Sequence, residues 1–393
     1  MKNRIVTIIG LFALLSTASA AGPKADFNVI PVPRTICAGT SAPFVLDSNT
    51  KIYYEEGQKR NAAFLQQYIT DITGIVPELT DRPRKRGTIS LRVKDTSSDA
   101  EGYTLTVDKK NIHIVGNSPA GVFYAIQTLR KALPAGQASE VEIPSCIVED
   151  SPRFAYRGVH LDVVRHFFPV DSVKRYIDII ALHNVNRFHW HLTDDQGWRV
   201  EIKSRPRLTS VGAYRKQTAG DGTPHGGFYT QDEIRDIIRY AQERYITIIP
   251  EIDIPGHSAA ALASYPEIGC TGGPYEVCEV WGGPADVLCA GKDETMQFLQ
   301  DVFTEIAGLF PSQYIHIGGD ECPKQRWKEC RACQAKIKEL GIVPDKKHSA
   351  EQKLQSYVMV SVEKFLAAKG RKVIGWDEIL EGGLGPDATV HSW

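Results

Sequence analysis

The sequence lacks several features that would place the protein in other functional classes. No apolar run beyond the N-terminal segment approaches the roughly 18 to 20 residues that a membrane-spanning helix needs. The formal net charge of -1 supplies no positive field for nucleic acid or an anionic membrane. The chain also has no glycine fingerprint for a dinucleotide and no HExxH metal motif. These absences favour a neutral substrate, with no nucleic acid and no membrane span among the expected partners.

The first 20 residues have the organisation of a secretory signal peptide. Lys2 and Arg4 precede an apolar stretch at 5–15, and the small residues at 16–20 fit an A-x-A cleavage site. We therefore expect an exported protein that is periplasmic, on the outer surface or secreted. No cysteine directly follows the expected cleavage site, which argues against a lipid-anchored form.

Eight cysteines follow the signal peptide, and export permits disulfides between them. Their pairing cannot be read from the sequence, but Cys270 with Cys289 is our choice for one bond that closes a loop. Cys330-x-x-Cys333 is typical of zinc and redox sites. Because no second CxxC and no nearby histidine pair accompanies it, a local disulfide or free thiols are favoured over a metal site.

Secondary-structure signals in residues 21–150 predict a small α/β domain. No catalytic constellation stands out within it, so we expect an accessory or packing role. Its predicted helices lie at 61–73 and 118–133, and its predicted strands at 88–93, 103–107 and 112–115.

Residues 151–393 repeat a strand followed by a helix. Repeats of this length without a dinucleotide fingerprint predict a (β/α)8 TIM-type barrel. Six strands are visible rather than eight, so we expect a barrel that is incomplete at its C-terminal end. Thr230 and Glu233 predict a capping box at the start of the second helix. The predicted strands are 156–162, 185–192, 246–253, 314–320, 372–377 and 388–393, and the helices are 171–182, 231–244, 294–310 and 351–369.

The most informative stretch is YIHIGGDE at 314–321. Its first residues are apolar β-formers that predict a buried strand, and the two glycines let the backbone turn tightly. Asp320 and Glu321 then end the strand. Two carboxylates in one pocket push their pKa values apart, so that one can hold a proton near neutral pH while the other stays ionised. This division suits acid/base catalysis.

Polar or aromatic side chains follow every predicted strand of the barrel, where the catalytic groups of TIM barrels lie. Tryptophans beside carboxylates suit a sugar, whose apolar C–H faces pack on aromatic rings while its hydroxyls bind charged groups. In strand order these residues are Asp162 and Arg165; His189, His191, Asp194 and Asp195; Glu251, Asp253 and His257; Asp320 and Glu321; Trp376, Asp377 and Glu378; and Trp393.

Five motifs in this order resemble those of glycoside hydrolase family 20, the β-N-acetylhexosaminidases. They are RGVHLDVVRHFF at 157–168, HWHLTDD at 189–195, EIDIPGH at 251–257, HIGGDE at 316–321 and GWDE at 375–378. The resemblance extends from about residue 27 to the end of the chain. It implies an exported bacterial exo-enzyme that removes terminal non-reducing β-linked N-acetylglucosamine or N-acetylgalactosamine from oligosaccharides or glycoconjugates. It implies no cofactor and no metal.

The resemblance also implies a retaining, substrate-assisted mechanism, in which the acetamido carbonyl of the substrate is the nucleophile. Glu321 would protonate the leaving oxygen and later activate water. Asp320 would orient the acetamide N–H and stabilise the oxazolinium-like intermediate. In the ordinary retaining scheme the two carboxyl groups flank the sugar about 5 to 5.5 Å apart, which two neighbouring residues cannot easily do. If the substrate supplies the nucleophile, both acids can lie on one side of the sugar.

Supporting roles follow from the same resemblance. Asp194 and His257 look like a dyad near the acid, and Arg165 looks like the residue that holds the hydroxyls of the terminal sugar. Trp376 and Trp393 look like walls around the acetamide methyl group. Two further supporting groups are Asp253 and His316.

Two other functions remain open at this point. The missing strands would carry further pocket residues in the family, so the chain could be a catalytically silent sugar-binding fragment. His189 and His191 alternate onto one face of a strand, so a metal-dependent barrel hydrolase is the second alternative. Oligomeric state and the preferred sugar are not readable from the sequence.

Overall fold

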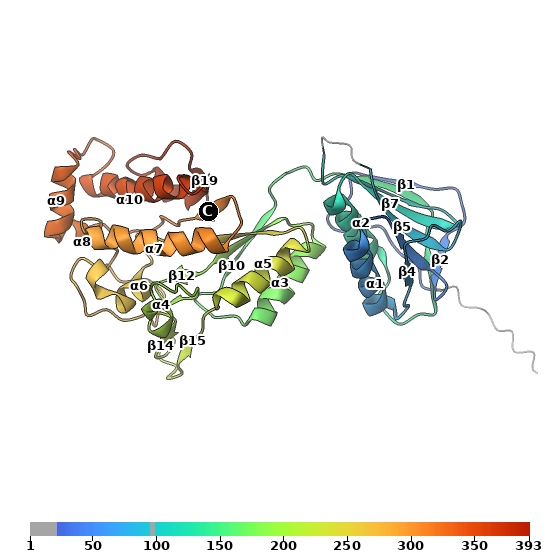
Figure 1. Ribbon diagram of the computed structural model, residues 1–393, viewed down its shortest axis with the longest axis horizontal. Coiled ribbons are helices and arrows are strands. Elements are labelled where there is room, and N and C mark those ends of the chain that lie inside the picture. The colour runs from blue at the N-terminus through green and yellow to red at the C-terminus, as the bar shows by residue number, and fades with distance from the viewer. Residues whose placement is uncertain (1–21, 95–98) are drawn as a thin grey trace, which may run out of the picture. The chain divides into compact units, whose positions relative to one another are not determined.

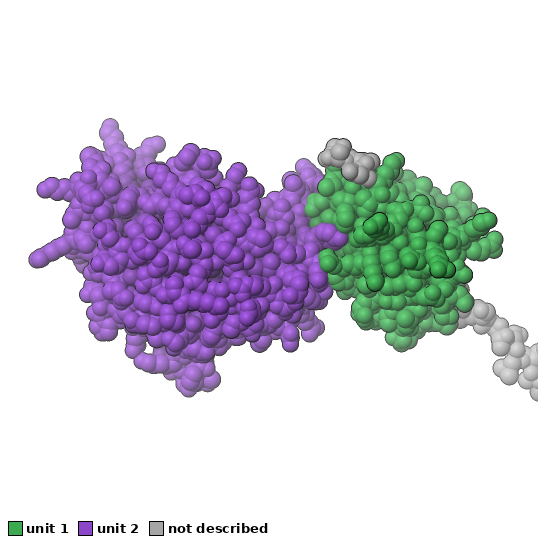
Figure 2. Space-filling view, viewed as in Figure 1, with its two compact units in different colours: residues 1–151 green, residues 152–393 purple. Residues whose placement is uncertain are grey.

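The computed structural model describes residues 22–94 and 99–393, and the predicted signal peptide at 1–20 lies outside these residues. The chain divides into two compact units, residues 1–151 and 152–393, which Figure 2 colours separately. Among the described helices, none combines the length and the apolar character that a bilayer-spanning segment requires.

The first unit is built on a seven-stranded mixed sheet with the order β1-β9-β6-β7-β5-β3-β4, accompanied by a two-stranded sheet of β2 and β8. Helices α1 (Lys59–Thr73) and α2 (Pro119–Ala132) pack on each other and on the larger sheet (Figure 1). The strands are β1 Thr35–Ala38, β2 Phe44–Asp47, β3 Lys51–Tyr54, β4 Glu78–Thr80, β5 Thr88–Val93, β6 Tyr103–Val107, β7 Asn111–Gly116, β8 Glu140–Ile143 and β9 Cys146–Asp150.

Local signals account for the helices of this unit. Gly74 ends α1 in the left-handed conformation at φ 76°. Ser118 caps α2 by accepting a hydrogen bond from the Ala120 N–H, with Pro119 in the first turn. The sequence predicted both helices and the strands β5, β6 and β7. It missed the other strands because segments this short carry little periodicity.

The second unit is built on six parallel strands that follow one another in chain order, β10-β11-β16-β17-β18-β19. Helices α3, α5, α7 and α10 connect the first five of them. This arrangement confirms the predicted TIM-type barrel, of which the described residues supply six consecutive strands. The bounds are β10 Gly158–Asp162, α3 Val170–Leu182, β11 Arg187–His191, α5 Gln231–Gln242, β16 Thr247–Glu251, α7 Asp293–Leu309, β17 Tyr314–His316, α10 Ala350–Ala367, β18 Lys372–Trp376 and β19 Thr389–His391.

The predicted helix ends lie within two residues of the observed ones, and the capping box of Thr230 and Glu233 is present at α5. The predicted strands are longer than the observed ones. The largest difference is at β17, which ends at His316 rather than Asp320. Gly318 and Gly319, with φ values of 63° and 104°, leave the extended conformation at this point.

Short elements that the sequence did not predict lie on the connections at one end of this sheet. They follow β11, β16, β17 and β18 and carry much of the chain that surrounds the strand ends (Figure 1). These elements are β12 Thr193–Asp194, β13 Gly197–Trp198, α4 Arg207–Ser210, β14 Tyr214–Arg215, β15 His225–Gly226, α6 Ala259–Ser264, η1 Pro266–Ile268, α8 Gln325–Glu329, α9 Arg331–Glu339 and η2 Asp377–Leu380.

The cysteines differ from the sequence-based expectation. Every cysteine in the described residues is a free thiol, so the disulfide expected between Cys270 and Cys289 is not formed. The two residues nevertheless lie near each other, together with Cys330 and Cys333. The prediction of a loop-closing disulfide was therefore wrong. The two cysteines are members of a cluster of four thiols.

Candidate active site

The strand register places four polar residues in one row across the sheet of the second unit. Asp162 pairs with His191, His191 with Glu251, and Glu251 with His316. Each of these residues is the last of its strand. In parallel strands the carboxyl ends lie at the same edge of the sheet, so the register alone brings these side chains together.

Glu251 is the centre of this row and is fully buried. Its carboxylate lies 2.8 Å from His189 Nε2, 2.5 Å from His191 Nδ1 and 3.0 Å from His316 Nδ1, and it accepts a 2.9 Å hydrogen bond from Trp376 Nε1. Burial opposes ionisation, but the surrounding histidines, His191 foremost, hold the pKa of Glu251 well below its ordinary value. The carboxylate is therefore charged and fixes Trp376 at the strand end.

Asp194 on β12 forms a second buried centre beside the row. It lies 2.9 Å from His191 Nε2, 3.1 Å from His257 Nδ1 and 2.7 Å from Arg165 Nη2. Although burial raises the pKa of Asp194, hydrogen bonds from His191 and His257 lower it overall. Burial likewise opposes the charge of His257, but hydrogen bonds to Asp194 and Asp195 raise the pKa of this histidine well above its ordinary value. His257 is thus an imidazolium.

The other nitrogen of His257 faces the two acids that follow β17. His257 Nε2 lies 3.5 Å from Asp320 Oδ2 and 3.6 Å from Glu321 Oε2. The side chain of Asp320 is 15% exposed, whereas that of Glu321 is 59% exposed. The predicted dyad of Asp194 and His257 therefore reaches both acids, with Glu321 open to solvent and Asp320 largely enclosed.

Asp320 and Asp253 are a close carboxyl pair at the base of the site. Burial raises the pKa of Asp320 to about 6, with His257 acting in the opposite direction. Burial, reinforced by the charge of Asp320, raises the pKa of Asp253 well above its ordinary value. Asp253 also accepts a hydrogen bond from the Gly319 N–H. A Cβ at Gly318 would lie 1.6 Å from Asp253 Oδ1, so only glycine permits this approach.

Two residues of the site hold a left-handed backbone that side chains rarely adopt. His257 has φ 46° and Glu321 has φ 43°. Such conformations persist only where the surrounding structure imposes them, and they concentrate at functional sites. This backbone conformation directs the His257 imidazole and the Glu321 carboxylate toward the edge of the sheet at which the parallel strands end.

Arg165 follows β10 and is held by two carboxylates rather than pointing freely outward. Its guanidinium binds Asp162 at 2.9 Å and Asp194 at 2.7 Å, and its Nε donates to Gln196. The guanidinium carbon of Arg165 lies 5.5 Å from the centroid of the Trp281 ring. Trp281 was not singled out from the sequence, because it lies in the long connection after β16, away from any strand end.

The two predicted tryptophan walls are neighbours. The Trp376 and Trp393 rings lie 6.5 Å apart in an edge-to-face arrangement, and Trp393 is 72% exposed. The His391 ring stacks on Trp376 at 4.7 Å. Aromatic faces and carboxylates thus share one end of the sheet, which is the combination that a sugar requires.

Sequence reasoning missed several members of this network. His160 contacts the His189 ring at 4.7 Å, and burial lowers its pKa to about 4. His391 and the central role of Glu251 were also not predicted. The alternation of His160 with Asp162, and of His189 with His191, was the available signal. The metal alternative rested on His189 and His191, whose imidazoles both hydrogen-bond to Glu251.

Residues 154–393 match the model of the glycosyl hydrolase family 20 catalytic domain, and residues 26–151 match that of domain 2 of the same family.

The chain belongs to glycosyl hydrolase family 20.

Relatives within family 20 support this assignment. A protein named beta-hexosaminidase from Porphyromonas gingivalis is 44% identical over 93% of this chain and 47% of its own length. Another of that name from Vibrio furnissii is 37% identical over 95% of this chain and 61% of its own length. The chain therefore spans about half the length of the curated relatives it matches.

Solved structures of family 20 share the fold. An exo beta-N-acetylglucosaminidase from Vibrio harveyi, in complex with N-acetylglucosamine, superimposes with a TM-score of 0.83 at 34% identity and covers 95% of this chain and 58% of its own. The beta-N-acetylhexosaminidase from Streptomyces coelicolor superimposes with a TM-score of 0.81 at 34% identity, covering 95% of this chain and 71% of its own.

Proposed function

We propose that this family 20 protein is an exo-acting β-N-acetylhexosaminidase that removes terminal β-linked N-acetylglucosamine or N-acetylgalactosamine from oligosaccharides or glycoconjugates. Family membership, the names of the relatives and the N-acetylglucosamine complex of the Vibrio harveyi enzyme support this proposal. The observation that carries it is the approach of Asp320 and Glu321 to one nitrogen of His257, at 3.5 and 3.6 Å.

Two acids that share one histidine nitrogen lie on one side of a bound sugar. They cannot easily flank it as an acid and a protein nucleophile must, so the nucleophile has to come from the substrate. Its acetamido oxygen attacks the anomeric carbon and forms an oxazolinium ion. Glu321, the exposed acid, protonates the leaving oxygen and then activates water. Asp320, the enclosed acid, accepts the acetamide N–H and balances the positive charge.

The surrounding groups position these two acids. The His257 imidazolium, held by Asp194, favours the ionised form of Asp320 and lies within 3.6 Å of both carboxylates. Glu251 holds Trp376, which walls the acetamide methyl group together with Trp393. Arg165 presents its guanidinium, oriented by Asp194, to the hydroxyls of the sugar.

We also propose that the protein is exported, as the N-terminal segment at 1–20 predicts, so that it acts on glycans outside the cytoplasm. Fractionation of cells that produce the natural protein tests this. Mature protein beginning near residue 21 in the periplasm, on the outer surface or in the medium is the expected result. Protein that retains the segment in the cytoplasm would contradict it.

The decisive experiment measures hydrolysis of an aryl β-N-acetylglucosaminide by the natural protein and by Glu321→Gln. We expect loss of about 10²- to 10⁴-fold in kcat, because an amide cannot donate the proton. Glu329→Gln, an exposed change of the same chemistry on α8, is the control and should retain wild-type kcat. Full activity in Glu321→Gln, or a glycosyl ester trapped on either acid, would overturn the mechanism.

A sugar-binding role without turnover is the alternative, and the exposure of Trp393, 72%, is the observation that favours it. A wall this open leaves the acetamide side of the site accessible to solvent. N-acetylglucosamine that binds to the protein without any release of the aryl group, under the conditions of the same assay, would support this alternative.

A further inference from the structure

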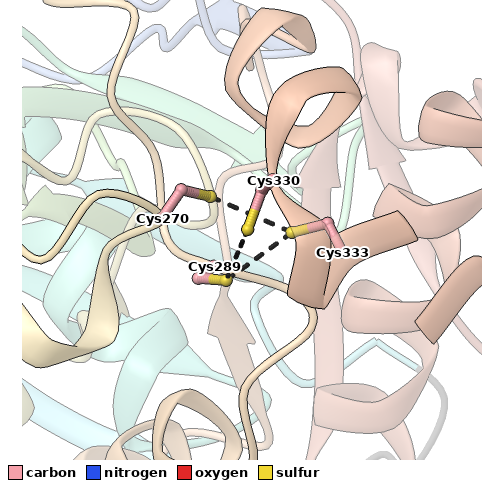
Figure 3. A group of neighbouring side chains, drawn as sticks. All are labelled: Cys270, Cys289, Cys330 and Cys333. Carbon is pink, nitrogen blue, oxygen red and sulfur yellow. Dashed lines mark hydrogen bonds between the residues drawn. The ribbon is translucent and has the colours of Figure 1, made fainter. Parts of the chain in front are cut away.

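A cluster of four thiols lies in the second unit, apart from the residues assigned to the sugar. Figure 3 shows their sulfur atoms turned toward a common centre. Two of them come from the connection between β16 and α7, and two from the start of α9. The members of this four-cysteine cluster are Cys270, Cys289, Cys330 and Cys333.

The sulfur distances do not separate into two bonded pairs. Cys289 Sγ lies 3.7 Å from Cys330 Sγ and 3.6 Å from Cys333 Sγ, and Cys333 Sγ lies 3.9 Å from Cys270 Sγ. All four sulfur atoms lie within 4.8 Å of one another. A disulfide needs about 2.05 Å, whereas four thiolates at about 2.3 Å from a tetrahedral zinc ion are about 3.8 Å apart. The three separations between 3.6 and 3.9 Å match edges of that tetrahedron, and the 4.8 Å limit brings the remaining sulfur atoms close to it.

The backbone around the cluster is fixed by groups other than the thiols. Trp327 is fully buried and its indole N–H donates to the Leu288 carbonyl at 2.9 Å. Gly291 lies against the first turn of α9, where a Cβ would be 2.2 Å from the carbonyl carbon of Ala332. These contacts hold the two segments together closely enough for their sulfur atoms to meet, as a rigid metal site requires.

The chemistry of the four side chains also favours a soft metal ion. Cys289 and Cys333 are fully buried, and four thiols are weak partners for one another as neutral groups. A set of four sulfur ligands selects zinc or iron over magnesium or calcium. The sequence showed only one CxxC because the other two ligands lie far away along the chain.

We propose that the four-cysteine cluster binds one structural Zn²⁺ ion, which cross-links the two connections that carry the acids and their histidine. His257 lies on the connection after β16, and Glu321 lies on the one after β17. The ion ties these connections beyond both residues, so it limits the movement of the exposed Glu321 relative to His257. It takes no part in the reaction, since all four positions of a tetrahedral site are filled by protein.

The first test measures metal and thiol content of the natural protein, purified without added metal, reductant or chelator. We expect about one zinc ion per chain by inductively coupled plasma mass spectrometry. We also expect four thiols that react with a thiol reagent only after the unfolded protein is treated with a chelator. Less than a tenth of an equivalent of zinc would overturn the proposal, whether the cause is a pair of disulfides or another bound metal.

The second test uses matched variants. Cys333→Ser should lose at least nine-tenths of the zinc, whereas Cys37→Ser, an exposed cysteine in the first unit, should retain it. Full zinc content in Cys333→Ser would overturn the assignment of the ligands. If this variant does not fold, Co²⁺ exchanged into the wild-type protein should give the sulfur-to-cobalt absorption of a tetrahedral thiolate site, and the absence of that absorption would count against the proposal.

A third measurement separates this proposal from the proposed enzyme activity. Hydrogen exchange of the wild-type protein, with and without a chelator, should show faster exchange at 322–333 after zinc is removed and no change in the first unit. The zinc content, the thiol count and this exchange do not depend on hydrolysis. Unchanged exchange at 322–333 after complete zinc removal would contradict the cross-linking role.

Discussion

The two units of the chain bury polar groups of different kinds. In the described part of the first unit, the buried polar side chains are neutral, as Gln127 and Thr128 are. In the second unit they include the ionisable side chains Asp194, Glu251 and Asp253. Because a buried charge costs several kcal/mol unless it is paired, the second unit must supply partners for each one. These three residues lie at or just after the ends of strands, which is the pattern of a reactive site rather than of a scaffold.

The largest effect on stability is expected from removing the buried charge of Glu251 in the second unit. Burial lowers the pKa of His191, but the charge of Glu251 and hydrogen bonds to Asp194 and Glu251 raise it well above its ordinary value. Glu251→Gln removes that charge beside a buried imidazolium, and we expect a loss of about 3 to 5 kcal/mol in the free energy of unfolding. Urea denaturation of the second unit measures it. Glu329→Gln is the matched exposed change and should stay within about 0.5 kcal/mol of the wild type. Equal losses in the two variants would mean that burial does not decide the cost.

The pH dependence of stability tests the effect of burial on one carboxyl group, that of Asp320. Burial raises the pKa of Asp320 to about 6 in the folded protein, above its ordinary value of 3.8. Between these values the unfolded state binds fewer protons, so this group lowers stability as pH rises from about 4 to 6. Asp320→Asn removes that effect. We expect the variant to gain about 1 to 3 kcal/mol relative to the wild type across this range, measured by denaturation at each pH.

Asp71→Asn, on the exposed side of α1 in the first unit, is the control for that experiment. Because this side chain is exposed, its substitution should change stability by no more than about 0.5 kcal/mol. A difference between Asp320→Asn and the wild type that stays constant across this pH range would contradict the raised pKa. Activity gives a second readout, since wild-type kcat should fall below about pH 6 as Asp320 takes up a proton.

The smallest expected effect comes from the neutral core of the first unit. Ile114 on β7 is fully buried in that unit. Ile114→Val removes one methylene group, and we expect a loss of about 0.5 to 1.5 kcal/mol in the stability of the first unit. kcat/KM should remain unchanged, because the site is built from residues of the second unit and none of the described residues of the first unit belongs to it. A fall in kcat/KM without loss of folded protein would show that the first unit takes part in the reaction.

Much of the fold was predictable because its signals are local. The capping box at α5, Ser118 at α2 and the repeated strand–helix pattern were read from neighbouring residues, and all are present. The short strands of the first unit were missed because segments of this length carry little periodicity. β17 was predicted too long because the sequence does not show where Gly318 leaves the extended conformation.

The site was predicted in part for the same reason. The carboxylates Asp320 and Glu321 are adjacent in sequence, so their meeting needed no fold. The role of Glu251 depends on the register of three strands, and a shift of one residue would turn it to the other face of the sheet. Only the folded chain therefore showed that it joins three histidines and Trp376.

By itself, the sequence determined the order of the six barrel strands and of the helices between the first five, the pair of acids that follows β17 and the family, because each depends on residue types within short segments. Tertiary structure decided which groups distant along the chain lie together. The four-cysteine cluster is the clearest case. Its sulfur atoms come from segments up to 63 positions apart. Their separation depends on how the connections after β16 and β17 pack together, and a pattern of neighbouring residues cannot show this.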